Sequence, residues 1–275
     1  MGEARNIRIF DSKEKAYDFI IDVWTQKARI AIEQRGRFAV ALSGGKTPVG
    51  FFNGLSQTKD LPWEKTHIFQ VDERFVPWND DENNSRLIKQ CLIDRIAIPP
   101  ENIHFIPTEE ITMDEASKLY ERELQIFFGD HDTIPRFDLI MLGISDDGHT
   151  ASLFTGFDPQ CEAGRLAIPV VTGRVPHQRI TLTLNVINSA RRVIFLVTGK
   201  HKALTIQKII EKKDYGLPAS HIELENGVLF YVLDREAASM LRSSQQQNDG
   251  EICRKSPHTN ACRFLWKISC CSSDS

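Results

Sequence analysis

The sequence predicts an α/β fold with a largely parallel sheet. Short apolar runs alternate along the chain with longer segments in which apolar residues recur at helical spacing, and this alternation is typical of βαβ units. The runs at 38–42, 137–142 and 193–197 are almost entirely apolar, as expected of strands that are covered on both faces. Each of these runs ends in a polar loop that contains glycine. Loops at the carboxyl ends of parallel strands are where such folds bind their ligands.

The predicted strands are short and are bounded by turn residues. They lie at 7–10, 38–42, 67–71, 103–106, 137–142, 167–171, 179–184, 193–197 and 228–232. Because Pro169 has no backbone donor, we expect the strand at 167–171 to lie at a sheet edge.

Helices are predicted between these strands by apolar periodicity and by capping residues. Asp11 or Ser12 caps a first helix, which continues to Gln34 and is stopped by Gly36. The other helices are expected after Pro48, from Ser85 to about Arg95, after Thr112 (which forms a capping box with Glu115), at 203–210, briefly at 218–220, and from Asp234 to about Leu241.

A strand, a glycine-rich turn and a helix follow one another at 38–55. The turn at 43–48, with the sequence SGGKTP, directs backbone N–H groups and a helix N-terminus toward one point, which suits a phosphate. Thr47 is the expected N-cap, with Pro48 at the first helical position. The turn is not a Walker A loop, because the upstream glycine is missing at the required spacing. A tight turn without a ligand is the alternative interpretation.

The loop after the strand at 137–142 carries a histidine among carboxylates. It runs from Gly143 to Gly156 with the sequence GISDDGHTASLFTG, and it contains Asp147 and His149. An imidazole titrates near neutral pH and can act as a general base, while a neighbouring carboxylate can orient the ring. A structural histidine bonded to a loop carbonyl is the alternative.

A second charged group follows the strand at 67–71, where the chain reads Asp72-Glu73-Arg74. Two acids and an arginine at the end of a strand suit a functional site better than a core. A solvated salt-bridge cluster is the alternative.

With these segments in place, the sequence resembles the 6-phosphogluconolactonase family. The resemblance covers about residues 7–241, and together its motifs are highly specific. The motifs are LSGGKTP at 42–48, VDERFVP at 71–77, LG at 142–143 with DGHTASLF at 147–154, QRITLT at 178–183 and, more weakly, TG at 198–199 with KA at 202–203. Thr155 departs from the family pattern, where proline is usual, but this change removes no reactive group.

The resemblance implies a three-layer α/β/α sandwich with a mostly parallel, Rossmann-like sheet. It also implies hydrolysis of 6-phospho-D-glucono-1,5-lactone to 6-phospho-D-gluconate, in the oxidative pentose phosphate pathway. This reaction needs no metal and no redox cofactor. His149 would be the general base that activates water, and either Asp147 or Asp72 would orient it. Arg74 would lie near the lactone carbonyl or instead hold phosphate. The phosphate is expected to be bound by Ser43, Gly44, Gly45, Lys46, Arg179 and Lys202.

Two other functions compete with this interpretation. Glucosamine-6-phosphate isomerases have a similar Asp-Gly-His loop, but theirs continues as Ile-Ala-Phe-Asn-Glu, whereas this loop continues as Thr-Ala-Ser-Leu-Phe at 150–154. A non-catalytic sugar-phosphate sensor is the second alternative. That alternative predicts a fused DNA-binding segment, and the sequence contains no helix-turn-helix pattern.

Composition and charge narrow the range of possible binding partners. Hydrophobic residues make up 41% and charged residues 26% of the 275 residues, and the net charge of −3 gives no reason to expect nucleic acid or an anionic membrane. No apolar run approaches the roughly 20 residues of a membrane helix, and the N-terminus lacks the apolar core of a signal peptide. We therefore expect a cytoplasmic protein, and we expect it to be a monomer. The resemblance implies that its partner is a small phosphosugar lactone.

The composition changes near the end of the chain. We expect residues 1–242 to form the α/β domain and residues 243–275 to form a polar, disordered tail. The tail holds four of the six cysteines, at positions 253, 262, 270 and 271, and their spacing matches no zinc template.

Overall fold

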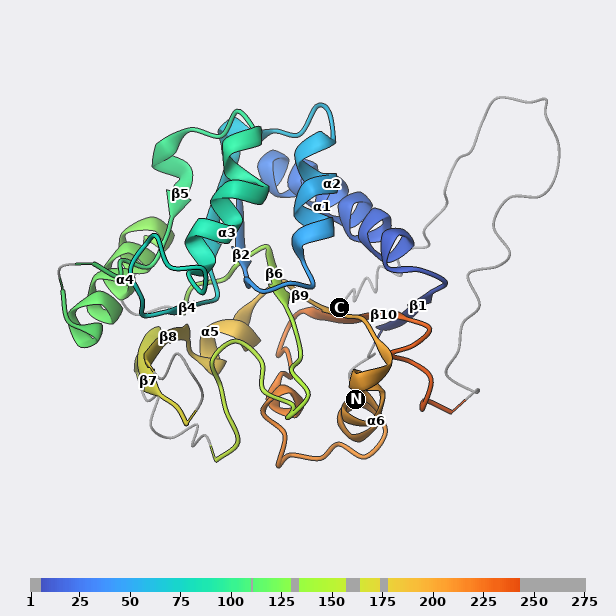
Figure 1. The fold of residues 1–275 in the computed structure, drawn as a ribbon. Coiled ribbons are helices and arrows are strands. Elements are labelled where there is room, and N and C mark those ends of the chain that lie inside the picture. The colour runs from blue at the N-terminus through green and yellow to red at the C-terminus, as the bar shows by residue number, and fades with distance from the viewer. Residues whose placement is uncertain (1–5, 110, 130–133, 157–163, 174–177, 243–275) are drawn as a thin grey trace, which may run out of the picture.

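The predicted α/β architecture is confirmed by the computed structural model, which describes residues 6–109, 111–129, 134–156, 164–173 and 178–242. A seven-stranded sheet lies between layers of helices (Figure 1). Its neighbouring strands are all parallel. In spatial order they are β1 (Asn6–Phe10), β10 (Val228–Asp234), β9 (Arg192–Val197), β6 (Leu139–Leu142), β2 (Phe38–Leu42), β3 (Thr66–Gln70) and β5 (Ile103–His104).

The order of the central strands positions the site. β6 pairs with β9 on one side and with β2 on the other. Because all three strands run in the same direction, the loops that follow them meet at one edge of the sheet. These are the glycine-containing loops that begin at Ser43, Gly143 and Thr198.

A second, smaller sheet extends this edge. It is antiparallel and contains β4 (Asp72–Arg74), β8 (Gln178–Leu182) and β7 (Ala167–Val171), in that order. Val71 joins the two sheets, because its N–H donates to Leu42 O at 3.0 Å and its carbonyl accepts from Leu182 N at 2.7 Å. The sequence predicted β7 and β8 but neither the separate sheet nor β4. The edge position expected for Pro169 is confirmed, since β7 is the outer strand.

The helices cover both faces of the parallel sheet. The helices with at least one full turn are α1 (Lys13–Arg35), α2 (Val49–Gln57), α3 (Asn84–Cys91), α4 (Met113–Phe128), α5 (Leu184–Ser189) and α6 (Ala203–Ile210). Two caps are as predicted: Ser12 accepts from Lys15 N at the start of α1, and Gly36 ends it at φ 75°. The capping box of Thr112 and Glu115 at α4 is also confirmed.

Strand β2 shows how the layers are separated. Val40 and Leu42 pack into the core beneath α1, α2 and α3, whereas Ala39 and Ala41 pack into the core shared with α4, α5 and α6. Successive side chains of a strand point to opposite faces, so a strand buried on both sides must be apolar throughout. Figure 1 shows α1 and α2 on one side of the sheet and α6 on the other.

Three predicted details are wrong. Thr47 does not cap α2, because Pro48 occupies the N-cap and no side chain bonds the first turn. The strand at 179–184 ends at Leu182, and Leu184 instead begins α5. Residues 235–241 form turns rather than a helix, although Asp234 Oδ1 accepts from Ala237 N at 2.7 Å, as an N-cap would.

The end of α3 corrects one further boundary. The helix predicted to reach Arg95 ends at Cys91, and a 3-10 turn at Ile93–Arg95 follows it. Other 3-10 turns lie at Trp63–Lys65, Pro100–Asn102, Lys200–Lys202 and Pro218–His221. The predicted tail at 243–275 lies outside the described residues.

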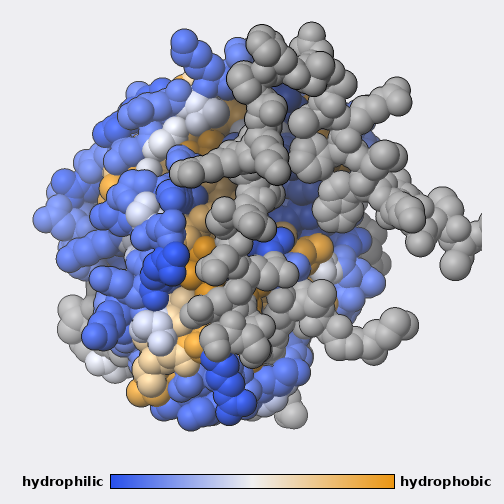
Figure 2. Space-filling model, turned by 90° about the vertical axis from the view of Figure 1, so that its right-hand side faces the viewer, coloured by the Kyte–Doolittle hydropathy of each residue, from blue (hydrophilic) through white to orange (hydrophobic). Residues whose placement is uncertain are grey.

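The described surface is largely hydrophilic on the face shown in Figure 2, where apolar residues occupy smaller areas. In the part of the chain that the structure describes, no helix combines the length and the apolar character needed to cross a membrane.

Candidate active site

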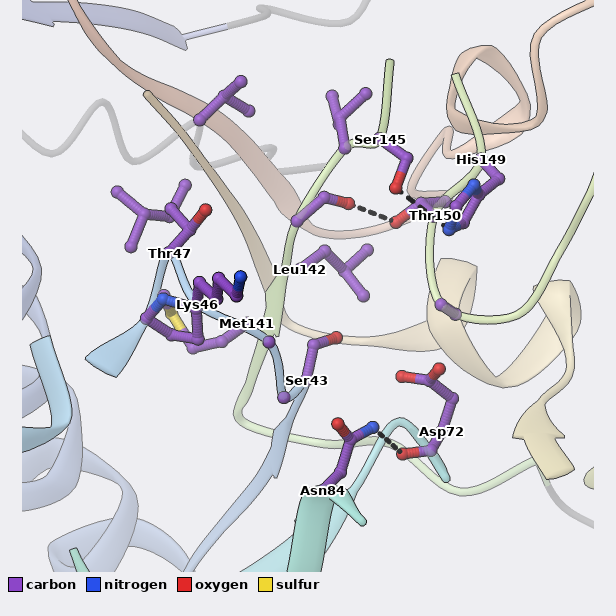
Figure 3. Close-up of a pocket in the computed structure, with 18 of the residues that line it drawn as sticks. Ser43, Lys46, Thr47, Asp72, Asn84, Met141, Leu142, Ser145, His149 and Thr150 are labelled. Atoms are coloured by element: carbon purple, nitrogen blue, oxygen red, sulfur yellow. Dashed lines mark hydrogen bonds between the residues drawn. The ribbon is translucent and has the colours of Figure 1, made fainter. Parts of the chain in front are cut away.

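A cavity of about 210 Å³ opens at the carboxyl edge of the parallel sheet. The loops after β2, β6 and β9 line it, together with β4 and β8 of the second sheet (Figure 3). The predicted site residues that line this cavity are Ser43, Gly44, Gly45, Lys46, Asp72, Arg74, His149, Arg179 and Lys202. Asp147 is the remaining predicted residue, and it contacts His149 directly.

The loop after β6 holds His149 in a closed turn. Ser145 N donates to His149 O at 3.0 Å, and Gly148 N donates to Ser145 O at 2.9 Å. Gly148 has φ 80°, and a Cβ at this position would lie 2.9 Å from Leu217, so both backbone conformation and space require glycine. Thr150 Oγ1 adds a bond to Gly143 O at 2.8 Å. The imidazole is thus presented on a fixed backbone.

Both ring nitrogens of His149 have a partner within its own loop. Nδ1 lies 2.7 Å from Asp147 Oδ1, and Nε2 lies 3.0 Å from Ser145 Oγ. A carboxylate can only accept, so in the neutral imidazole Nδ1 carries the proton and Nε2 is left as an acceptor for the serine hydroxyl. The face of the ring packs on Phe154, with 4.4 Å between ring centroids. The sequence had left Asp147 and Asp72 open as orienting residues, and it is Asp147 that contacts the imidazole.

Asp72 lies elsewhere in the cavity. It is buried, and its Oδ2 accepts a hydrogen bond from Ser152 Oγ at 2.8 Å. Its backbone carbonyl accepts from Asn84 Nδ2 at 3.1 Å. These bonds fix a carboxylate across the cavity from the histidine loop (Figure 3).

Unlike Asp72, Glu73 has a structural role. Its buried carboxylate accepts from the backbone N–H groups of Asn84 and Ser85, each at 2.7 Å, and from Gln70 Nε2 at 2.7 Å. Burial raises the pKa of Glu73, and these donors oppose that rise. The side chain therefore ties the first turn of α3 to β4, and it does not line the cavity.

Two arginines face each other across the β4–β8 pair. Arg74 and Arg179 are register partners, and both line the cavity. Arg74 Nη1 donates to Glu82 O at 2.7 Å, while its buried Nε has no hydrogen-bond partner. Arg179 is only 7% exposed, and its guanidinium carbon lies 5.6 Å from the centroid of Phe154. Two guanidinium groups thus border the same space as His149.

The loop after β9 contributes a lysine. Lys202 Nζ lies 2.5 Å from Asp146 Oδ1, and this hydrogen bond lowers the pKa of Asp146. Lys46 is exposed and also lines the cavity. The turn at Ser43–Lys46 lines the same cavity, and Gly45 in this turn has φ 94°. Backbone in this conformation and the uncapped start of α2 leave N–H groups available to an anion.

Sequence reasoning did not predict two side chains of the site. Ser145 bonds the imidazole of His149, and Asn84 lies against Gly44 in the turn at Ser43–Lys46. Neither stands out in the sequence, because serine and asparagine are common in loops and at helix starts. The described residues contain no group of three or more His, Cys, Asp or Glu side chains arranged to hold a metal ion.

Comparison with known proteins identifies relatives of the whole α/β unit. The family model for glucosamine-6-phosphate isomerases/6-phosphogluconolactonase matches residues 11–231. The chain is 38% identical over 221 residues to a 6-phosphogluconolactonase of Synechocystis sp., covering 79% of this chain and 90% of that protein. It is 34% identical over 248 residues to the 6-phosphogluconolactonase of Rattus norvegicus, covering 86% and 93% of the two chains.

A solved structure agrees with these sequence matches. The crystal structure of 6-phosphogluconolactonase from Thermotoga maritima superposes with a TM-score of 0.72 and 30% identity, over 84% of this chain and 99% of that one. The chain therefore belongs to the glucosamine-6-phosphate isomerase/6-phosphogluconolactonase family.

Proposed function

We propose that the chain hydrolyses 6-phospho-D-glucono-1,5-lactone to 6-phospho-D-gluconate, as a carboxylic ester hydrolase of carbohydrate metabolism. Relatives named 6-phosphogluconolactonase, similar over most of the chain, support this assignment. The observation that carries it is the His149–Asp147 pair, which borders a cavity rich in cations. A base and an anion-binding surface in one cavity suit an ester whose far end is a phosphate.

In this mechanism His149 is the general base. Its Nε2 takes a proton from water while the water oxygen bonds to the lactone carbonyl carbon, and Asp147 stabilises the imidazolium that forms. The C–O bond to the ring oxygen then breaks, and His149 returns the proton to that oxygen. Such a base is typically worth about 10²–10⁴ in rate. Ser145 Oγ must leave Nε2 before water can bond there.

The developing negative charge needs a cation near the carbonyl oxygen. Arg74 suits this role, because its buried Nε has no hydrogen-bond partner and it lines the same cavity as His149. Asp72 is a fixed acceptor and suits the polar part of the substrate. The orienting role toward His149 is assigned to Asp147.

The phosphate is assigned to the other side of the cavity. The turn at Ser43–Lys46, which contains Gly44 and Gly45, lines the cavity, and Lys46, Lys202 and Arg179 supply positive charge. Arginine offers a planar fork to phosphate oxygens, and lysine offers a point charge. Holding the remote phosphate positions the carbonyl carbon for attack.

The family also contains isomerases that act on amino-sugar phosphates, so this activity is the alternative to test. The residues at 150–154, Thr-Ala-Ser-Leu-Phe, favour the lactonase over the isomerase. In the structure Ser152 bonds Asp72 and Phe154 packs on His149, so both residues hold side chains that line the cavity. No observation favours a non-catalytic sensor.

We propose further that residues 1–242 are the catalytic unit and that it acts in the cytoplasm as a monomer, without nucleic acid or membrane. The family match from residue 11 to residue 231 supports the first part.

The test is hydrolysis of freshly generated 6-phosphogluconolactone, followed by proton release and compared with the spontaneous rate. A parallel sample contains glucosamine 6-phosphate with ammonia detection. Fast lactone turnover without ammonia release is the expected result. Ammonia release without lactone turnover would assign the isomerase activity instead, and turnover of neither substrate with 6-phosphogluconate still bound would favour a sensor.

A further inference from the structure

One buried amide of the cavity has an unused acceptor. Asn84 is the first residue of α3, is 2% exposed, and lines the cavity. Its backbone N–H donates to Glu73 Oε1 at 2.7 Å, and its Nδ2 donates to the backbone carbonyl of Asp72 at 3.1 Å. Two bonds to neighbouring residues of β4 therefore fix both the backbone and the side chain of Asn84.

These bonds also fix which way the amide points. A carbonyl can only accept, so the atom that faces Asp72 O must be the nitrogen, and the oxygen must lie on the other side. That oxygen, Oδ1, is fully buried and has no hydrogen-bond partner. Buried polar atoms in native proteins are nearly always bonded, so an unbonded one on a residue that lines a cavity indicates a ligand group.

The glycine-rich turn at Ser43–Lys46 packs directly against the same oxygen of Asn84. A Cβ on Gly44 would lie 2.1 Å from Asn84 Oδ1, closer than atoms can approach. Gly44 is thus glycine because Asn84 lies against it, in addition to any contact with phosphate. The Asn84 amide therefore helps to form the wall of the cavity.

Two more groups complete a polar subsite around Asn84. Ser43 Oγ is buried without a partner, and the carboxylate of Asp72 is held by Ser152. Figure 3 shows the side chains of Ser43, Asp72 and Asn84 turned toward the space that they enclose. Asn84 Oδ1 and the carboxylate accept hydrogen bonds, and the serine hydroxyl can do either. This subsite favours groups that donate, whereas the arginines and lysines of the cavity favour anions.

We infer that Asn84, together with Ser43 and Asp72, binds ring hydroxyl groups of the sugar and is a specificity-determining residue of the site. This inference rests on the proposed lactonase function and identifies the part of the substrate between the phosphate and the carbonyl. A hydroxyl donates to Asn84 Oδ1, and the amide loses no bond because its nitrogen stays on Asp72. A lactone without that hydroxyl leaves the oxygen unpaired, so the site discriminates against it.

The experiment compares the wild type with Asn84→Ala on four substrates: 6-phosphogluconolactone and its 2-deoxy, 3-deoxy and 4-deoxy analogues. The variant also loses the bond to Asp72, and this loss affects every substrate alike. The substrate-dependent part measures the hydroxyl contact. We expect kcat/KM to fall about tenfold more for the full lactone than for one of the three analogues, as for one neutral hydrogen bond.

Asn83→Ala is the matched control. Asn83 is as buried as Asn84 and precedes it in the chain, but its Oδ1 caps α3 by accepting from Arg86 N, and it does not line the cavity. Its loss should lower the melting temperature without changing the ratio of kcat/KM between substrates. Asn84→Ser, which removes the amide oxygen but keeps a small polar side chain at the helix start, serves as the second variant and should show the same substrate-dependent loss.

The outcomes separate the inference from the function on which it rests. An equal fall of kcat/KM on all four substrates, or no fall on any, overturns the hydroxyl contact and leaves Asn84 as a structural residue. In both cases the wild type still hydrolyses the lactone, and the proposed function stands. A wild type that hydrolyses none of the four lactones contradicts the proposed function itself.

Discussion

His149 is held at both ring nitrogens by residues of its own loop. Asp147 lies at Nδ1 and Ser145 at Nε2, at 2.7 Å and 3.0 Å. The two contacts have opposite consequences for catalysis. The carboxylate selects the tautomer that leaves Nε2 able to accept a proton, whereas the serine hydroxyl occupies the position that an attacking water must take.

Replacing Asp147 with asparagine should lower kcat about 10²-fold and leave KM nearly unchanged. An amide can donate to Nδ1 and so favours the wrong tautomer, and it cannot stabilise the imidazolium. Steady-state kinetics of lactone hydrolysis measure both constants. Asp146→Asn is the matched control in the same loop, because Asp146 pairs with Lys202 rather than with His149. An Asp147→Asn variant as fast as this control would refute the orienting role.

Replacing Ser145 with alanine should leave kcat within about threefold of the wild type. If water is the nucleophile, removing the hydroxyl only vacates Nε2. The alternative is that Ser145 itself attacks the carbonyl, since Ser145, His149 and Asp147 form the chain of contacts found in serine hydrolases. A fall of 10²-fold or more in kcat would contradict direct attack by water and indicate an acyl-enzyme intermediate.

At the scale of the elements, the sequence located the loops but not their neighbours. Glycine and polar residues after apolar runs marked the turn at 43–48 and the loop at 143–156 as ends of strands. That β2 and β6 are adjacent depends on pairing between strands far apart in the sequence, which local patterns do not encode. The resemblance to a known family supplied that information for the fold as a whole.

The second sheet shows the same limit more clearly. β4 has three residues, too few for a recognisable alternation, and it pairs with β8 more than 100 positions away in the chain. Arg74 and Arg179 meet only through this pairing. The motifs named both residues, but their proximity required the structure. Asn84 and Ser145 were missed for a related reason, since their roles lie in contacts and not in residue type.

A pair of histidines near the outer edge of the parallel sheet should make the stability of the protein depend on pH. On β3, His67 Nδ1 lies 3.2 Å from His104 Nε2 on β5, and His104 Nδ1 lies 2.6 Å from Glu123 Oε1 on α4. Burial, His104 and Arg37 lower the pKa of His67 from 6.5 to about 4. The folded protein thus binds fewer protons here than the unfolded chain between these values, and stability must fall as the pH falls from 6.5 to about 4.

The His67→Phe variant measures this contribution while keeping the ring packed on Phe127. Because His67 is partly exposed, solvent screening reduces the expected effect to about 2 kcal/mol. Chemical denaturation at several pH values should show the wild type losing this much more unfolding free energy than the variant between neutral pH and pH 4. Parallel curves for the two proteins would contradict the lowered pKa.

For the whole molecule, the site depends on both sheets and on loops from residue 43 to residue 202. Among the described residues, the α/β unit that supports these loops has two apolar cores, and the family match ends at residue 231. A chain ending at Arg242 should therefore melt within about 2 °C of the full chain and retain its lactonase kcat. Calorimetry and the lactonase assay check both values. A loss of folding or of activity would show that residues 243–275 belong to the catalytic unit.

The proposed mechanism depends most on His149 as the general base. The most direct test is kcat for lactone hydrolysis by His149→Ala, measured together with calorimetric binding of 6-phosphogluconate. We expect kcat to fall by about 10²–10⁴. Binding should stay within about threefold of the wild type, because the cations and the turn at 43–46 remain in place. Undiminished turnover by a variant that still binds the product would contradict the assignment of the base.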